Sequence, residues 1–142
     1  MEILVSLNDP NAKPPQRQKD GDAGYDLFSS VNETIYENSR KRINTHISVA
    51  IPNGYYGRIL GRSSIALNCI DVGAGVIDSG YRGEIDVLLI NNSDTDVKIK
   101  SGERIAQLVI MKHETPIFKV VDKAMLDNTD RGSNGFGSTG KY

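Results

Sequence analysis

The sequence has little cysteine, no tryptophan and almost no net charge. Its 142 residues include a single cysteine, Cys69, which excludes a disulfide framework within the chain and is typical of a reducing compartment. We expect this thiol to be buried and structural rather than nucleophilic. Seventeen Lys and Arg residues stand against 18 Asp and Glu residues, for a formal charge of −1. No general basic field would therefore attract nucleic acid, and any anion binding must be local.

Long hydrophobic runs are also missing, and so is a cluster of metal-binding side chains. No run approaches membrane-spanning length, and the first residues lack the basic start and apolar stretch of a secretory signal. We therefore expect a soluble intracellular protein, in cytoplasm or nucleus, with no membrane and no nucleic-acid partner. His46 and His113 have no second histidine or cysteine at ligand spacing. This argues against a zinc site and against a Ser-His-Asp triad.

Short stretches of β-favouring residues recur along the chain, with turn signals such as Asn53-Gly54 and Ser101-Gly102 between them. After a short first strand, the stretches cover 25–29, 43–51, 55–60, 85–91, 97–99, 105–111 and 117–121. Only Ser63 to Asn68 is predicted to be helical. A length of 142 residues suits one domain with one core. Many short strands separated by turns predict an all-β domain of the jelly-roll kind.

The glycine-rich segment from Gly73 to Gly83 sets a carboxylate and an aromatic ring, Asp78 and Tyr81, three residues apart. Val76-Ile77 predicts a short strand, Ser79-Gly80 a tight turn, and residues 84–90 the returning strand of a hairpin. Backbone groups beside the glycines stay open to a ligand, which favours a small pocket. An ordinary surface hairpin with a solvated Asp accounts for the segment equally well.

Three further positions could bind an anion or a cation. Arg62, Ser63 and Ser64 place a guanidinium and two hydroxyls at the start of the predicted helix, which suits phosphate, although plain helix capping is the simpler alternative. Gln107 sets a neutral amide in an apolar strand, where it needs phosphate, metal-bound water or neighbouring backbone as a partner. Asp26 begins another predicted strand and could hold a hard cation through water, or be merely solvated.

The C-terminal residues 131–140 combine an arginine, an aromatic ring, hydroxyls and four glycines. Such parts suit a lid over a nucleotide, because an arginine fork and glycine-turned amides both bind anions. A disordered terminus is the alternative. Residues 135–141 also read G-x-x-x-x-G-K, the start of a P-loop. Tyr142 stands where a Ser or Thr would bind magnesium, and no strand–loop–helix unit surrounds the motif, so we reject a P-loop ATPase.

Taken in order, five segments resemble the five motifs of the trimeric dUTP diphosphatases (dUTPases). They are AGYDL at 23–27, GRSSIAL at 61–67, GVIDSGYRGEI at 75–85, GERIAQL at 102–108 and RGSNGFGSTG at 131–140. The resemblance implies a distorted jelly-roll domain over residues 1–130, a flexible lid over residues 131–142, and a homotrimer with shared active sites. It also implies Mg²⁺-dependent hydrolysis of dUTP to dUMP and pyrophosphate, which limits uracil in DNA and supplies dUMP for dTMP synthesis.

The same resemblance implies a role for each matched residue. Asp78 would be the general base for the water that attacks the α-phosphorus. Tyr81 would stack under the deoxyribose and exclude a 2′-hydroxyl, and Asp26 would hold magnesium through water. The other substrate-binding positions would be the uracil-reading backbone of Gly75, Val76, Ile77 and Asp86, the phosphate-facing Arg62, Ser63, Ser64 and Gln107, and the closing residues Arg131, Phe136, Gly137, Ser138 and Thr139. Gly61 and Asp86 depart from the usual residues of the family pattern.

Two other functions share part of this pattern. A dCTP deaminase would have the same fold but needs a glutamate on the strand after the predicted hairpin, where this chain reads Val87-Leu88-Leu89-Ile90. Deamination therefore lacks its acid–base group. A dUTPase-like regulatory protein would use the trimer to dock a partner without turnover. The presence of Asp78, Tyr81, Arg131 and Phe136 favours an active hydrolase over this alternative.

Overall fold

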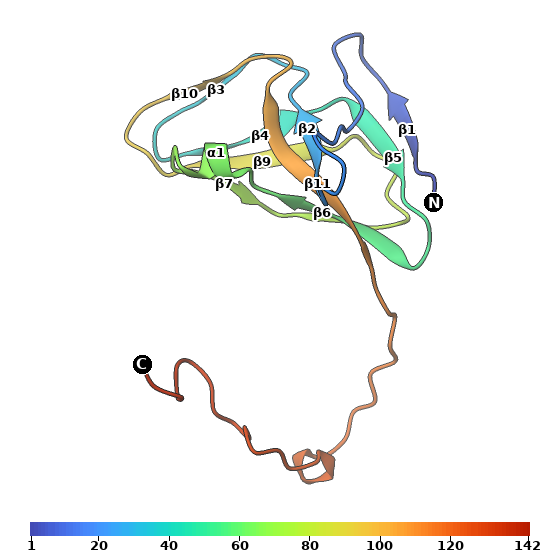
Figure 1. Cartoon of the computed structure of the whole chain (residues 1–142), viewed down its shortest axis with the longest axis vertical. Helices are drawn as coiled ribbons and strands as arrows, with labels where there is room; N and C mark the ends of the chain where they lie inside the picture. Colours follow the sequence, from blue (N-terminus) through green and yellow to red (C-terminus); the bar gives the residue numbers. More distant parts are fainter.

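The computed structural model describes all 142 residues and shows a β-structure followed by a long C-terminal tail (Figure 1). The strands are β1 Leu4–Leu7, β2 Tyr25–Phe28, β3 Glu33–Ile35, β4 Arg40–Asn44, β5 Ile47–Ala50, β6 Tyr55–Leu60, β7 Ile70–Gly73, β8 Val76–Ile77, β9 Asp86–Asn91, β10 Val97–Ile99 and β11 Arg104–Lys112. The only α-helix, α1, covers Ser63–Ala66, and a 3₁₀ turn covers Lys123–Met125. The predicted all-β class with one short helix is confirmed. No helix is long and apolar enough to cross a membrane.

The strands pair antiparallel in four small sheets. The larger ones run β2-β11-β6-β8 and β4-β9-β7, and the smaller ones pair β1 with β5 and β3 with β10. Along β9, buried and half-buried residues alternate, so Val87, Leu89 and Asn91 face the interior. Antiparallel sheets with one face in the core and one face in water show this alternation.

A cluster of 16 buried apolar residues forms the core between these sheets. Ile43 of β4, Val87 and Leu89 of β9 and Ile105 of β11 are fully buried, and each such side chain stabilises the fold by about 1.5–3 kcal/mol. The buried amide of Asn91 donates to the carbonyls of Ile35, Tyr36 and Thr95 at 3.1, 3.2 and 2.9 Å. Its polar group is thus satisfied inside the core.

The strand predicted over 43–51 is wrong as a single element. β4 ends at Asn44 and pairs with β9, whereas β5 begins at Ile47 and pairs with β1. Between them His46 has a φ of 50°, a left-handed conformation that no strand continues through. The His46 amide donates to Asn44 Oδ1 at 2.6 Å, so a local side-chain bond stabilises the break that the alternating pattern conceals.

The hairpin predicted around Ser79-Gly80 is also wrong, although its tight turn exists. The Tyr81 amide donates to the Asp78 carbonyl at 3.1 Å, which closes the turn. However, β8 pairs with β6, and β9 pairs with β4 and β7. Residues 78–85, hereafter the crossover loop, therefore connect two different sheets rather than two paired strands.

The segment from the end of α1 to β7 also differs from the structure that the sequence predicted. Cys69 is exposed, with a φ of 61°, because it lies in the turn that leads from α1 into β7. The expectation of a buried thiol is therefore wrong. The helix ends at Ala66 rather than at Asn68, and β7, a short strand, has no counterpart in the sequence pattern.

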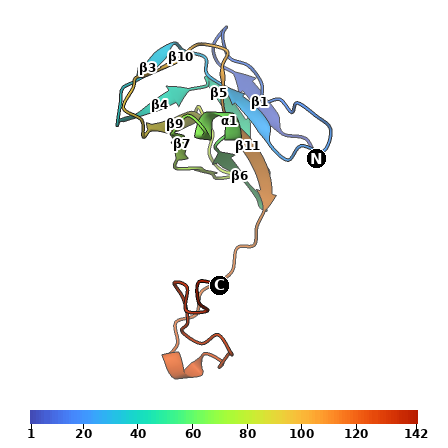
Figure 2. The ribbon, with the colours of Figure 1, turned by 60° about the vertical axis from the view of Figure 1, so that its left-hand side comes forward.

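The strand predicted over 117–121 does not form. After β11 the chain leaves the sheets and runs away from them, as both views show (Figures 1 and 2). Ile117, Phe118 and Val120 are 97%, 90% and 97% exposed. A strand needs a partner for its backbone groups, and this segment finds none within its own chain. Residues 117–121 therefore have the apolar sequence pattern of a strand but lack the backbone pairing that a strand requires.

Candidate active site

The register of three strands sets Asp26, Gln107 and Leu60 in one row. On β11, Gln107 lies opposite Asp26 of β2 on one side and opposite Leu60 of β6 on the other. Arg62 follows just after the end of β6. The sheet thereby gathers three motifs that are far apart in the sequence, and it does so through backbone pairing.

Asp26 is the electrostatic centre of this row. Its side chain is nearly buried, and Arg62 Nε lies 3.0 Å from its Oδ1 while Arg104 Nε lies 3.6 Å from its Oδ2. Gln18 Nε2 also donates to Oδ2, at 3.0 Å. A carboxylate removed from water needs such partners, so Asp26 holds Arg62 in place. Sequence reasoning missed Gln18 and Arg104, because the loop that leads into β2 and a bulge in β11 bring them here.

Gln107 shows why a glycine stands at position 24. Its Nε2 donates to the Gly61 carbonyl at 2.9 Å. Of the three partners expected for this amide, the single chain therefore provides the backbone carbonyl. A Cβ at Gly24 would lie 2.0 Å from Gln107 Oε1. Only a residue without a side chain lets the amide into this position.

These residues line a hollow of about 450 Å³. Arg62, Ser63, Ser64, Gln107 and Asp26 all contribute to its wall. Both serines are exposed, and no side chain caps the start of α1, so the capping alternative for Ser63 and Ser64 is wrong. The hollow therefore presents a guanidinium, an amide and uncommitted hydroxyls to solvent.

The crossover loop carries the second group of predicted site residues. Asp78 is exposed and takes part in none of the chain's ion pairs. Tyr81 is 44% exposed, and its hydroxyl donates to the Glu84 carbonyl at 2.8 Å. Before the loop, the Gly75 carbonyl accepts the Ile59 amide at 2.7 Å. After it, the Asp86 carboxylate lies 3.6 Å from Arg42.

Within these two groups, Asp78 and Arg62 lie toward opposite ends of β6. Ile77 pairs with Gly57, and beyond it Ser79 Oγ donates to Asn53 Oδ1 at 3.4 Å. At the rise of a β-strand, the five steps along the chain from Gly57 to Arg62 span roughly 16 Å. Within one chain, Asp78 therefore does not reach the hollow beside Arg62.

The tail forms a third group, apart from the other two. Arg131 Nε donates to the Asn134 carbonyl at 3.1 Å, and the hollow beside it is lined by tail residues alone, from Asp130 to Thr139. Phe136, Gly137, Ser138 and Thr139 are all exposed, so the strands β1–β11, hereafter the barrel, do not cover them. The single chain thus keeps three sets of predicted site residues separate.

A sequence profile of the dUTPase family matches residues 10–140. The chain belongs to the dUTPase family. Among its relatives, the deoxyuridine 5′-triphosphate nucleotidohydrolase of avian adenovirus 8 is 47% identical over 100% of this chain and 86% of that protein. The enzyme of the same name from Candida albicans is 46% identical over 98% of this chain and 88% of its own length.

Solved dUTPase structures agree with the fold. The dUTPase of Staphylococcus bacteriophage 80alpha with dUPNHPP has a TM-score of 0.93 at 31% identity and covers 99% of both chains. A mutant dUTPase of S. aureus phage phi11, described for the coordination of a structural Mg(II) ion, has a TM-score of 0.82 at 29% identity, over 87% of this chain and 98% of that one. The jelly-roll-like fold expected for a dUTPase is therefore confirmed.

The residues of this dUTPase do not form a metal site by themselves. No three His, Cys, Asp or Glu side chains converge on a common point. In the hollow, both oxygens of Asp26 already have partners, from Arg62 on one side and from Gln18 and Arg104 on the other. Magnesium keeps several waters and binds through one or two carboxylates together with substrate phosphates. Asp26 therefore fits a cation that arrives with a polyphosphate and is contacted through water.

Proposed function

We propose that this chain hydrolyses dUTP to dUMP and pyrophosphate, and so limits uracil in DNA while supplying dUMP for dTMP synthesis. The observation that carries the proposal is the single hollow into which Asp26, Arg62, Gln107 and the two serines Ser63 and Ser64 converge. Relatives across nearly the whole chain are deoxyuridine 5′-triphosphate nucleotidohydrolases, and a phage dUTPase of the same fold is described with dUPNHPP.

Asp78 acts as the general base. Its carboxylate takes a proton from water while the water oxygen forms a bond to the α-phosphorus. The bond from that phosphorus to the bridging oxygen breaks, and pyrophosphate leaves with the electron pair. Asp78 suits this role because it is exposed and has no ion-pair partner in the chain, so it is free to orient a water.

Arg62 faces the phosphates together with Ser63, Ser64 and Gln107. Its guanidinium is already held at 3.0 Å by Asp26, which limits the freedom lost when it binds a phosphate oxygen. Asp26 would hold a magnesium ion through water, and that ion would neutralise part of the triphosphate charge. The hydroxyls and the amide bind and orient the remaining oxygens.

The base and sugar are read by the strand and loop that precede β9. Backbone groups of Gly75, Val76 and Ile77 and those around Asp86 hydrogen-bond uracil and reject cytosine, whose exocyclic amine puts a donor where uracil has an acceptor. Tyr81 lies under the deoxyribose and leaves no room for a 2′-hydroxyl. The tail then closes as a lid: Arg131 binds the γ-phosphate, Phe136 covers the base, and Gly137, Ser138 and Thr139 close on the triphosphate.

The active site is assembled from three chains of a homotrimer. One chain separates Asp78 from Arg62 along β6 and carries Arg131 on a tail away from both, so copies of the chain must complete each other's sites. Ile117, Phe118 and Val120, all at least 90% exposed, support this assembly, because apolar side chains gathered in one exposed segment mark an interaction surface.

Pyrophosphate release from dUTP, dCTP, dTTP and UTP, each with magnesium and with EDTA, tests the proposal. We expect turnover of dUTP alone, and only with magnesium. Ammonia release from dCTP would instead identify a deaminase. An intact trimer that turns over none of the four nucleotides would favour a regulatory binding protein.

A further inference from the structure

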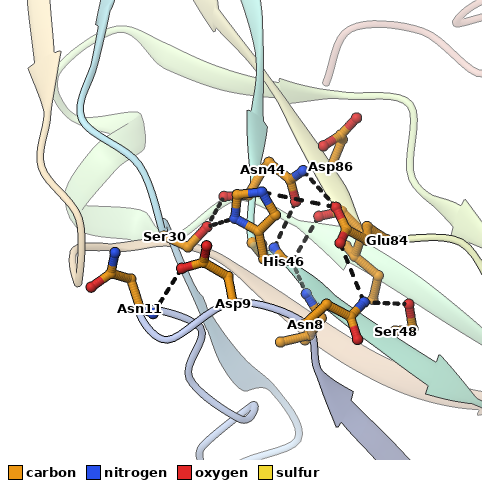
Figure 3. A network of polar contacts seen from close by, with 12 residues as sticks. Asn8, Asp9, Asn11, Ser30, Asn44, His46, Ser48, Glu84 and Asp86 are labelled. Atoms are coloured by element: carbon orange, nitrogen blue, oxygen red, sulfur yellow. Dashed lines mark hydrogen bonds and ion pairs between the residues drawn. The ribbon is translucent and has the colours of Figure 1, made fainter.

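Glu84, near the end of the crossover loop, is anchored by three side chains from two other segments (Figure 3). Asn44 Nδ2, at the end of β4, donates to Glu84 Oε2 at 2.8 Å, and Asn8 Nδ2, which follows β1, donates to Oε1 at 3.3 Å. His46 Nε2 lies 4.0 Å from Oε2. Nothing in the proposed chemistry requires these contacts, yet they hold the residue that lies three positions after Tyr81.

The anchoring side chains are themselves held in place. Asn44 Oδ1 accepts the His46 amide at 2.6 Å, and the His46 ring contacts the hydroxyl of the buried Ser30. Asn8 Nδ2 also reaches Ser48 Oγ at 3.1 Å. Because each of these side chains has a second partner, their contacts with Glu84 reinforce one another.

The backbone of Glu84 supports the ring of Tyr81. The Tyr81 hydroxyl donates to the Glu84 carbonyl at 2.8 Å. The ring lies against Gly83 so closely that a Cβ there would be 2.4 Å from Oη and 2.6 Å from Cζ. Gly83 has no left-handed φ that would call for glycine. Its lack of a side chain is therefore explained by the space that the ring occupies.

We infer that Gly83 and Glu84 are positioning residues that set the selectivity for deoxyribose over ribose. The inference rests on the proposed function, in which Tyr81 lies under the sugar. Rejection of a 2′-hydroxyl is steric, so it works only if the ring cannot move aside. The absence of a side chain at Gly83 leaves the space that the Tyr81 ring occupies, and the Glu84 carbonyl accepts the hydrogen bond of the Tyr81 hydroxyl. The Glu84 carboxylate in turn fixes the position of Glu84 through its hydrogen bonds to β4 and to the segment after β1.

The test compares kcat/KM for dUTP with that for UTP in Gly83→Ala and Glu84→Ala variants of the full chain. An apolar pocket rejects an isostere that adds a hydroxyl by about 100-fold, and we expect each variant to lose about tenfold of the dUTP-to-UTP ratio. The ratio cancels any loss of folded protein, because both substrates meet the same sample. Glu84→Gln keeps one acceptor oxygen for Asn44 and should restore most of the ratio.

Glu33→Gln is the matched control. Glu33 pairs with Lys41 of β4, the strand that also carries Asn44, but it contacts nothing in the crossover loop. We expect this variant to keep the wild-type ratio. An unchanged ratio in both Gly83→Ala and Glu84→Ala, or an equal fall in Glu33→Gln, would overturn the inference.

Hydrogen–deuterium exchange of the peptide covering residues 78–85 separates this inference from the proposed function, because it needs no substrate. We expect faster exchange in Glu84→Ala than in wild type or Glu33→Gln, since the loop loses its anchor. Unchanged exchange would overturn the anchoring role whatever the kinetics show. A wild-type chain that hydrolyses no dUTP would overturn the proposed function and the selectivity role together, while exchange still reports on the anchor.

Discussion

The barrel and the tail both carry predicted substrate-binding groups, but they hold them in opposite ways. Arg62 is fixed by Asp26, and Gln107 is fixed by the Gly61 carbonyl, so these groups keep their geometry without substrate. Arg131 and Phe136 contact at most their own tail. The barrel therefore binds with groups that are already organised, whereas the tail must lose conformational freedom to bind. This contrast predicts that the two regions fail differently when altered.

The largest effect is expected from the barrel residue that we propose to be the general base. Asp78→Asn should lower kcat for dUTP by about 10²–10⁴-fold, because an amide cannot take the proton from water. The affinity for a non-hydrolysable dUTP analogue, measured by calorimetry, should change little. A comparable loss of affinity would show that Asp78 has a structural rather than a chemical role.

Removing the tail should come next in size. Deletion of residues 131–142 should lower kcat/KM for dUTP by about 100-fold, because a lid positions substrate and excludes water. The melting temperature should stay at the wild-type value, since this segment does not pack against the barrel. Leu89→Ala, which opens a cavity in the core, should instead cost about 2–5 kcal/mol of stability. A similar loss of stability in the deletion would contradict the comparison.

Mixed trimers should sharpen the comparison further. In this experiment the Asp78→Asn chain is co-expressed with the tail-deleted chain, and about a quarter of wild-type activity should return. Each site then receives an intact Asp78 about half of the time and, independently, an intact tail about half of the time. The recovery requires that the two groups come from different subunits. Purified mixed trimers with no activity above the single variants would place both groups in one subunit.

The smallest effect is expected inside the organised hollow. Gly24→Ala would put a Cβ 2.0 Å from Gln107 Oε1 and displace the amide from the Gly61 carbonyl. The lost hydrogen bond should cost about 1 kcal/mol of stability, and KM for dUTP should rise several-fold. Gly80→Ala is the control, because nothing lies within 4 Å of a Cβ at that position. Equal behaviour of the two variants in chemical denaturation would show that Gln107 is not held as described.

Sequence patterns predicted the parts of the fold that depend on a few neighbouring residues. The strand expected over 85–91 and the turn at Ser79-Gly80 are of this kind, so they can be read directly. Pairing partners cannot be read in this way. The strand over 43–51 breaks at His46, and the crossover loop joins two sheets, because distant contacts decide where each strand goes. The segment 117–121 has the pattern of a strand but no partner within the chain.

The candidate site was predictable to a similar extent. Arg62, Ser63, Ser64, Gln107 and Asp26 could be listed from the motifs, and the structure brings them to one hollow. Their mutual contacts could not be foreseen. Asp26 pairs with Arg104 because of a bulge, and the Tyr81 ring packs against Gly83 because of the loop geometry. Residue spacing encodes neither of these features.

The bulge in β11 has a consequence for how such a protein can change. The register with β2 shifts between Arg104 and Ala106, so one strand accommodates a residue that the other does not match. Ile105 and Ala106 are consecutive, yet both are fully buried. Deleting one residue here would slide Gln107 away from Asp26 and turn its side chain to the other face of the sheet. In a library of variants selected for activity, insertions and deletions in β11 should therefore survive less often than most single substitutions in the hollow.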